Sequence, residues 1–95
     1  MEKKLSVVVS VYNEEQALPM FYETTKLILE ILPWDYELLF VNDGSRDDSL
    51  SILREYAARD EKVKFVSFSR NFGHEAAMIA GIDYADGDGI VCMDA

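Results

Sequence analysis

The sequence predicts an α/β fold in which helices cover both faces of a doubly wound, mainly parallel sheet. Four short apolar segments have the composition of strands, and a helix-forming segment separates each of them from the next. Strands that alternate with helices are joined by right-handed crossovers and pair in parallel. With 95 residues, of which 49% are hydrophobic, the chain has room for one domain with one core.

The first half of the chain holds two predicted strands and one helix. Residues 5–11 are apolar and β-branched, as in a strand that is buried on both faces. Pro19 suits the first turn of a helix, and Pro33 stops that helix. Residues 36–42 form the second strand. The apolar positions that recur at spacings of three and four and define the helix are Leu18, Phe21, Tyr22, Thr25, Ile28, Leu29 and Leu32.

The second half repeats the alternation. Ser45 and Asp48 lie three residues apart and resemble a helix-start signal. Residues 63–68 form the third strand, and the small-residue-rich segment 74–85 forms the third helix. The turn that precedes the last strand, Asp86-Gly87-Asp88-Gly89, lacks the full spacing of a phosphate or calcium loop, and Ile90 to Asp94 follow it as the fourth strand. The apolar stripe of the second helix consists of Leu50, Leu53 and Ala57, flanked by Ile52 and Tyr56.

The charge of the chain limits the partners that it can have. Its 18 acidic residues outnumber its 9 basic ones, so the formal net charge is −9. A surface of that charge repels phosphate backbones, and we therefore expect no nucleic-acid binding. An acidic protein that handles phosphates needs a cation to bridge the like charges.

Cysteine and methionine usage leads to expectations about the core. Cys92 is the only cysteine and lies in an apolar run, so we interpret it as a buried core thiol, and we assign Met20, Met78 and Met93 to the core as well. No apolar stretch approaches the length that spans a bilayer, and no signal-peptide pattern is present. We therefore expect a cytoplasmic location.

Polar side chains follow the predicted strands at their carboxyl ends, where doubly wound sheets bind ligands. Glu14 follows the first strand, Asp43 follows the second, and Asp94 ends the fourth. An acid at the end of an apolar strand loses hydration and needs a donor, a cation or a metal as a partner. The alternative is that such acids stabilise helix N-termini, and we assign Glu15, Asp47 and Asp48 to that role or to solvation.

Four ordered motifs, each at a strand end, resemble the family 2 glycosyltransferases. They are Val7-Val8-Val9-Ser10-Val11-Tyr12-Asn13-Glu14-Glu15, then Phe40-Val41-Asn42-Asp43-Gly44-Ser45 with Asp47 and Ser49, then Ser69-Arg70-Asn71-Phe72-Gly73-His74-Glu75, and finally Met93-Asp94-Ala95. The later motifs are similar to the branch that transfers a sugar to a polyprenyl phosphate. The resemblance covers essentially the whole chain.

The resemblance implies a nucleotide-diphosphate sugar, with uridine as the expected nucleoside, as the donor. Asp43 would accept the N3–H of a uracil-like base, and Glu14 would lie beside the nucleoside. Asp94 begins what resembles the D-x-D motif of the family, which holds the ribose and a divalent Mg²⁺ or Mn²⁺ ion, so Asp94 is the expected metal ligand. The expected nucleotide-binding residues are Ser10, Val11, Tyr12, Glu14, Val41, Asp43, Asp94 and Ala95.

Three departures from the family pattern shape what we expect of this chain. The sequence ends at Ala95, inside the motif, so residues 1–95 are expected to be the donor-binding half of a glycosyltransferase domain, inactive alone. The general base of the family lies beyond residue 95, and no residue of the chain is assigned a catalytic role. Ser10 stands where the family often has proline, which predicts a looser loop. A lipid-phosphate acceptor at the cytoplasmic face of a membrane is expected for the full-length protein.

Alternatives exist for the whole chain and for single residues. A receiver-type phosphoacceptor domain also places aspartates at strand ends, and a non-catalytic piece could self-associate into homo-oligomers through an unpaired sheet edge. Arg70 and Asn71 suit either an approach to the diphosphate or a surface salt bridge. For His74, the only histidine, a helix-start or packing role is favoured over catalysis.

Overall fold

The structure, a computed structural model, describes residues 3–95 and confirms the predicted α/β fold. Met1 and Glu2, which the sequence analysis placed ahead of the first strand, lie outside the described residues. The predicted boundaries agree with the observed ones to within one residue for most elements. The elements are β1 (Lys4–Val11), α1 (Leu18–Ile31), β2 (Asp35–Asn42), α2 (Ser49–Arg59), β3 (Val63–Ser67), α3 (His74–Tyr84) and β4 (Gly89–Asp94).

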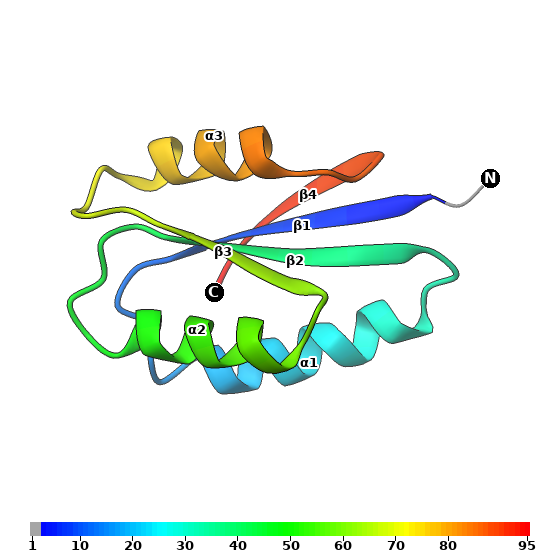
Figure 1. Cartoon of the computed structure of the whole chain (residues 1–95), viewed down its shortest axis with the longest axis horizontal. Coiled ribbons are helices and arrows are strands. Elements are labelled where there is room, and N and C mark those ends of the chain that lie inside the picture. The colour runs from blue at the N-terminus through cyan, green and yellow to red at the C-terminus, as the bar shows by residue number, and fades with distance from the viewer. Residues whose placement is uncertain (1–2) are drawn as a thin grey trace.

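The four strands form one parallel sheet in the order β3-β2-β1-β4. Helices α1 and α2 cover one face of this sheet, and α3 covers the other (Figure 1). The chain first winds from β1 to β3 and then crosses back through α3 to place β4 on the far side of β1. The strand order therefore reverses between β1 and β4, which is where sheets of this kind bind ligands.

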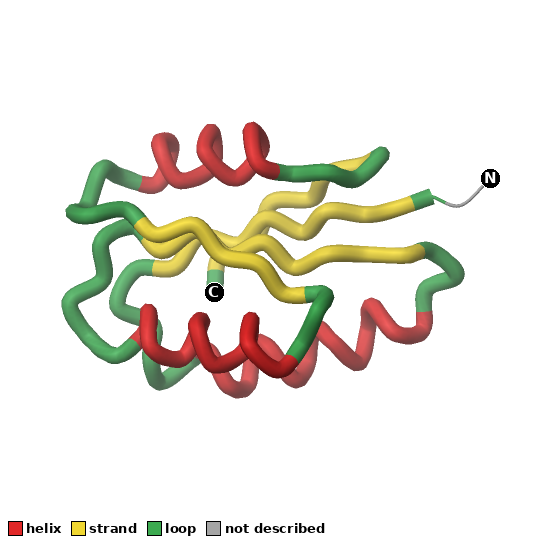
Figure 2. The backbone as a smooth tube through the Cα atoms, viewed as in Figure 1, coloured by secondary structure: helices red, strands yellow, loops and turns green. Residues whose placement is uncertain are grey.

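The core consists of two layers, one on each face of the sheet. Figure 2 shows the helices that cover these layers lying on opposite sides of the strands. Alternate side chains of the central strands point to opposite faces, since Val7 and Val9 belong to one cluster and Val8 to the other. The larger layer receives Leu18 and Leu29 from α1 and Leu53 and Tyr56 from α2, all of them buried; the Tyr56 ring stacks on the Tyr22 ring with 4.1 Å between their centroids. The central strands are buried on both faces, and this explains why their sequences are almost continuously apolar.

Three of the residues assigned to the core are exposed. Cys92 and Met93 are exposed because β4 is an outer strand of the described sheet and both of its faces lack cover, so an apolar sequence there does not imply burial. Met20 is 75% exposed on the outer face of α1, and Ile28 is exposed as well. Met78, by contrast, packs against the smaller core cluster as predicted.

The predicted start of the second helix is also wrong. Helix α2 begins at Ser49, and the N-cap residue Asp48, which precedes it, makes no capping hydrogen bond through its side chain. The Ser45 hydroxyl instead accepts a hydrogen bond from the Asn13 N–H at 2.9 Å. A residue that could cap its own helix is used to join two loops, and sequence spacing alone does not distinguish these roles.

A buried carboxylate organises the amino ends of the strands, away from the predicted site. Glu37 is 1% exposed and accepts hydrogen bonds from the Ser6 hydroxyl at 2.6 Å and from the Asp86 N–H at 2.7 Å. The Lys64 ammonium lies 2.9 Å from its other oxygen. Burial by itself raises the pKa of Glu37, but these donors outweigh it and lower the pKa to about 2. The turn before β4 is thereby attached to β1 and β2.

Within residues 3–95, none of the helices combines the length and the apolar composition needed to cross a bilayer.

Candidate functional site

The strand register brings the predicted acids to one edge of the sheet. Val11 at the end of β1 pairs with Asn42 of β2, and Ser10 pairs with Asp94 of β4. The Asp43 N–H donates to the Val11 carbonyl at 2.8 Å, and the Ala95 N–H donates to the Ser10 carbonyl at 3.3 Å. Asp43 and Asp94 therefore lie on either side of the end of β1, so the prediction that they share one edge is confirmed. Their contacts with a nucleotide stay predictions.

Asp94 presents a carboxylate that is held at only one of its two oxygens. Its Oδ1 accepts a hydrogen bond from the Ser10 hydroxyl at 2.8 Å and lies 2.7 Å from His74 Nε2. Within residues 3–95, no hydrogen bond reaches Oδ2. The Ser10 and His74 contacts hold the pKa of Asp94 below its usual value, so the carboxylate is ionised at neutral pH.

A hollow of about 220 Å³ opens beside this carboxylate. Its lining combines polar groups at one end with the apolar side chains of α3 and β4: His74, Met78, Cys92, Met93 and Asp94. An ionised oxygen at the rim of a partly apolar hollow is an arrangement that can orient a polar ligand.

Asp43 is buried, and its carboxylate accepts hydrogen bonds from other residues of the chain. Only 4% of the residue is exposed. Its Oδ1 accepts from the Phe72 N–H at 2.8 Å, and its Oδ2 accepts from the Asn71 side-chain amide at 2.8 Å and from the Gly73 N–H at 3.1 Å. A base that hydrogen-bonds to this carboxylate must share it with these three donors. A buried carboxylate that already accepts from three protein donors also counts against a receiver-type phosphoacceptor role.

The loop after β1 is firmly attached to the loop after β2. Asn13 has a left-handed backbone with φ 52°, and its side-chain oxygen accepts from the Arg46 N–H at 2.8 Å. The Glu14 N–H donates to the Ser49 hydroxyl at 3.0 Å, and the Glu15 N–H donates to the Asp47 carboxylate at 3.1 Å. The expectation of a loose loop is therefore wrong: Ser10 lacks the ring of proline, but the neighbouring loop supplies the restraint.

The remaining predicted residues divide by exposure. Val11 and Val41 are fully buried, so only their backbone groups can face a ligand. Tyr12 is 45% exposed. Glu14 is half-buried and lines a second hollow of about 340 Å³, whose other lining residues are Asn13, Glu15, Gln16, Ala17 and Asp47.

Two residues that sequence reasoning undervalued take part in the site. His74 begins α3, as expected, and its ring also contacts Asp94. Asn71 binds Asp43 and joins the loops after β2 and β3. Arg70 packs its guanidinium 4.8 Å from the centre of the Phe72 ring. The sequence signals for His74 and Asn71 were their position after a strand and their place in a family motif, neither of which reveals a partner twenty or more residues away.

The donor set fits a hard divalent cation in part. Among residues 3–95, no three His, Cys, Asp or Glu side chains form a cluster that could hold a metal ion. Asp94 offers an open carboxylate oxygen, the ligand type that Mg²⁺ and Mn²⁺ prefer. A single oxygen suits a cation whose other ligands come from the phosphates of a bound nucleotide.

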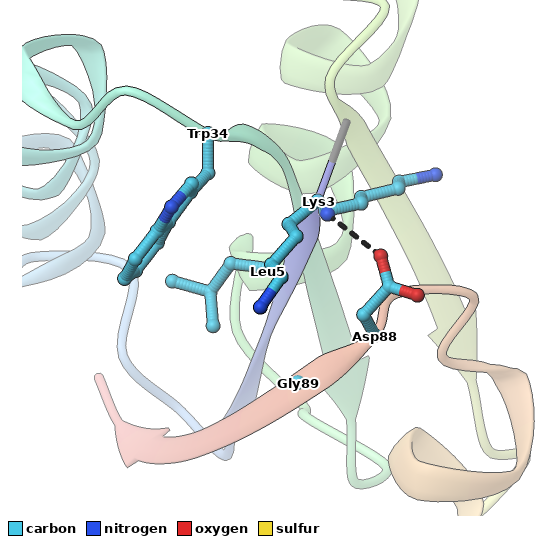
Figure 3. A pocket seen from close by; sticks show the side chains of 6 residues that line it. Lys3, Leu5, Trp34, Asp88 and Gly89 are labelled. Atoms are coloured by element: carbon cyan, nitrogen blue, oxygen red, sulfur yellow. Dashed lines mark hydrogen bonds between the residues drawn. The ribbon is translucent and has the colours of Figure 1, made fainter. Parts of the chain in front are cut away.

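The opposite end of the sheet holds a different hollow of about 330 Å³, lined by Lys3, Lys4, Leu5, Trp34, Asp88 and Gly89. Figure 3 shows the Trp34 ring and the Leu5 side chain facing each other across it. It lies at the amino ends of β1 and β4, and none of the predicted site residues lines it.

Curated proteins with similar sequences are glycosyltransferases. The chain is 52% identical over 90 residues to an uncharacterized glycosyltransferase, YkcC, of Bacillus subtilis (strain 168), covering 95% of this chain and 28% of the relative. It is 46% identical to a bactoprenol glucosyl transferase of Shigella phage SfV, with 96% and 30% coverage. It is 43% identical to an undecaprenyl-phosphate 4-deoxy-4-formamido-L-arabinose transferase of Proteus mirabilis (strain HI4320), with 97% and 28% coverage.

Solved structures share the fold. S. aureus TarS 1-349 in complex with UDP superposes with a TM-score of 0.81 at 25% identity, covering 96% of this chain and 27% of that one. The mannosyltransferase PcManGT from Pyrobaculum calidifontis, in complex with GDP-Man and Mn²⁺, gives a TM-score of 0.76 at 23% identity, with 99% and 28% coverage. The chain thus spans under a third of the length of these proteins. The model of glycosyl transferase family 2 matches residues 6–95, and the chain belongs to that family.

Proposed function

We propose that this chain binds the donor of a glycosyltransferase, a uridine-diphosphate sugar together with Mg²⁺ or Mn²⁺, and that the full-length protein transfers the sugar to a polyprenyl phosphate. One observation carries the proposal: an ionised carboxylate with an open oxygen, Asp94, lies at the point where the strand order reverses. The names of the relatives support the acceptor, since two of them act on bactoprenol or undecaprenyl phosphate.

In this proposal each loop at the carboxyl edge has a task. The backbone around Val11, Tyr12 and Val41 frames the base. Asp43 accepts a hydrogen bond from the edge of the base, because its three protein donors leave part of the accepting capacity of the carboxylate free. Glu14 lies beside the nucleoside, and the attached loops keep this frame rigid, which reduces the entropy lost on binding.

Asp94 and the backbone of Ala95 hold the ribose and diphosphate end of the donor. A divalent cation, when bound, would offset the charge that develops on the departing nucleotide diphosphate. The chain brings a net charge of −9 to this task, so a bridging cation also lessens its repulsion of the phosphates. No catalytic base is assigned within residues 1–95, and we expect no turnover from this chain alone.

The proposal is tested by thermal unfolding with and without UDP and MnCl₂. A ligand present at about 100 times its dissociation constant adds about 2.7 kcal/mol to the free energy of unfolding, so the melting temperature should rise by several degrees. Asp94→Asn keeps the size of the side chain and should remove most of the rise that depends on Mn²⁺. Chelation with EDTA should have the same effect on the wild-type chain.

The same measurement distinguishes UDP from GDP and can contradict the proposal. GDP in place of UDP should produce a smaller rise, because guanosine presents a different base edge to Asp43. If neither nucleotide changes the melting temperature, either in this chain or in a longer protein that contains it, the donor-binding assignment is wrong.

A further inference from the structure

We propose that Ser10 and His74 are positioning residues that hold the Asp94 carboxylate by Oδ1 and so present Oδ2 to the donor. This inference rests on the proposed function, because it concerns how the chain offers that carboxylate to a nucleotide diphosphate and its cation. It assigns a role to two residues that have no direct task in the scheme above.

Both contacts reach the same atom of Asp94. Ser10 approaches Oδ1 at 2.8 Å from β1, and His74 approaches it at 2.7 Å from α3. The Asp94 side chain is 70% exposed and would otherwise rotate freely in water. Two partners on different elements restrict both of its side-chain torsions, and they leave Oδ2 as the oxygen that faces a ligand.

His74 is itself held in place by the loop that precedes α3. It follows Gly73, whose backbone has φ 103° and whose N–H donates to Asp43 Oδ2 at 3.1 Å. The loop that carries His74 is therefore attached to one acid of the site, and its ring contacts the other. Asp43 and Asp94 are connected through this loop, so the chain fixes their relative position before any ligand binds.

There is space for a ligand beside the carboxylate. The hollow of about 220 Å³ that opens next to Asp94 is lined by His74 and Met78 from α3 and by Cys92 and Met93 from β4. Ser10 and His74 occupy Oδ1 and leave room around the carboxylate for a ligand atom. Such contacts are made to the residue that would bind the metal and not to the metal itself. Their removal typically lowers metal affinity by 10- to 100-fold.

The test uses Ser10→Ala, His74→Ala, the double variant and His74→Gln, which keeps a side-chain N–H. Glu75→Gln is the matched control, because Glu75 is the exposed neighbour of His74 on α3. The first measurement needs no ligand: NMR coupling constants that report the χ1 rotamer of Asp94. A single rotamer is expected in the wild type and in Glu75→Gln, and rotamer averaging is expected in the double variant.

The second measurement is a calorimetric titration of UDP in the presence of MnCl₂ and again in EDTA. Each alanine variant should weaken UDP binding with Mn²⁺ by roughly tenfold and leave UDP binding in EDTA unchanged, and His74→Gln should restore most of the affinity. A merely structural role would weaken both titrations equally.

The outcomes separate this inference from the proposed function. Wild-type chain that binds no UDP would overturn the proposed function, while the Asp94 couplings would still decide whether the carboxylate is positioned. Normal UDP and Mn²⁺ binding by the double variant, or one fixed Asp94 rotamer in it, would overturn the positioning role alone.

Discussion

Asn71 donates from its side-chain amide to the Asp43 carboxylate at 2.8 Å and to the Asp43 carbonyl at 3.1 Å. One side chain thus joins the loop that follows β3 to the loop that follows β2. The acceptor is a buried carboxylate. Loss of this bond should lower stability, because a buried acceptor without its donor is desolvated and has no compensating hydrogen bond.

We expect Asn71→Ala to lower the free energy of unfolding by about 1–3 kcal/mol. Asn71→Asp should cost more, since it places a second negative charge against Asp43. Urea denaturation at pH 7 measures both. Ser69→Ala, at an exposed position of the same loop, is the control and should stay within about 0.5 kcal/mol of wild type. Equal stability of all four proteins would contradict the importance of this bond.

Gly44 and Gly73 both have positive φ, at 68° and 103°, but their surroundings differ. A Cβ on Gly44 would collide with the backbone of Arg70 and Asn71, whereas a Cβ on Gly73 would meet nothing within 4 Å. Gly44→Ala should therefore cost both backbone strain and loop displacement, a loss of about 3 kcal/mol or more, and Gly73→Ala should cost strain of about 1–2 kcal/mol. Thermal unfolding of the two variants checks the order, and the reverse order would refute the close approach of the two loops at Gly44.

Glu37 should make the chain sensitive to acid. Its pKa is lowered from 4.5 to about 2, so the unfolded chain binds the proton more readily than the folded chain does. The contribution, on the order of 3 kcal/mol, is fully present above pH 4.5 and is lost as the pH falls toward 2. Glu37→Gln should be less stable than wild type at pH 7, and its stability should change less across that window. Glu61→Gln, at an exposed acid, is the control and should keep the wild-type pH profile.

The edge of β4 is where we expect any self-association of this chain. Val91 and Met93 are 44% and 39% exposed, and β4 pairs only with β1 among the described strands. Val91→Lys should shift sedimentation toward the monomer, because a charge on an edge strand opposes pairing with a second sheet. Leu27→Lys, at a position of α1 that is 70% exposed, should not. If only Leu27→Lys changed the oligomeric state, the interface would lie on α1 and not on β4.

Sequence patterns predicted the elements well wherever they depend on local chemistry. Pro19 and Pro33 mark the start and the stop of α1 because proline cannot donate a backbone hydrogen bond. The apolar, β-branched run before Tyr12 could only be a buried strand. The exposure of Cys92 could not be predicted in this way, because β4 has the composition of an inner strand but, among the described strands, the position of an outer one.

The candidate site shows the same division. That acids gather at the carboxyl edge follows from the alternation of strands and helices, which the sequence displays. That Asp94 is held by Ser10 and His74, that Asp43 is occupied by residues 71–73, and that Ser45 joins loops rather than caps a helix all depend on contacts between residues far apart in the chain. The order of apolar and polar residues determined the fold and the edge that carries the acids, because burial and backbone geometry act locally along the chain. Only the tertiary structure decided which donor meets which carboxylate, because a hydrogen bond depends on distances of a few tenths of an ångström between segments that a sequence does not place.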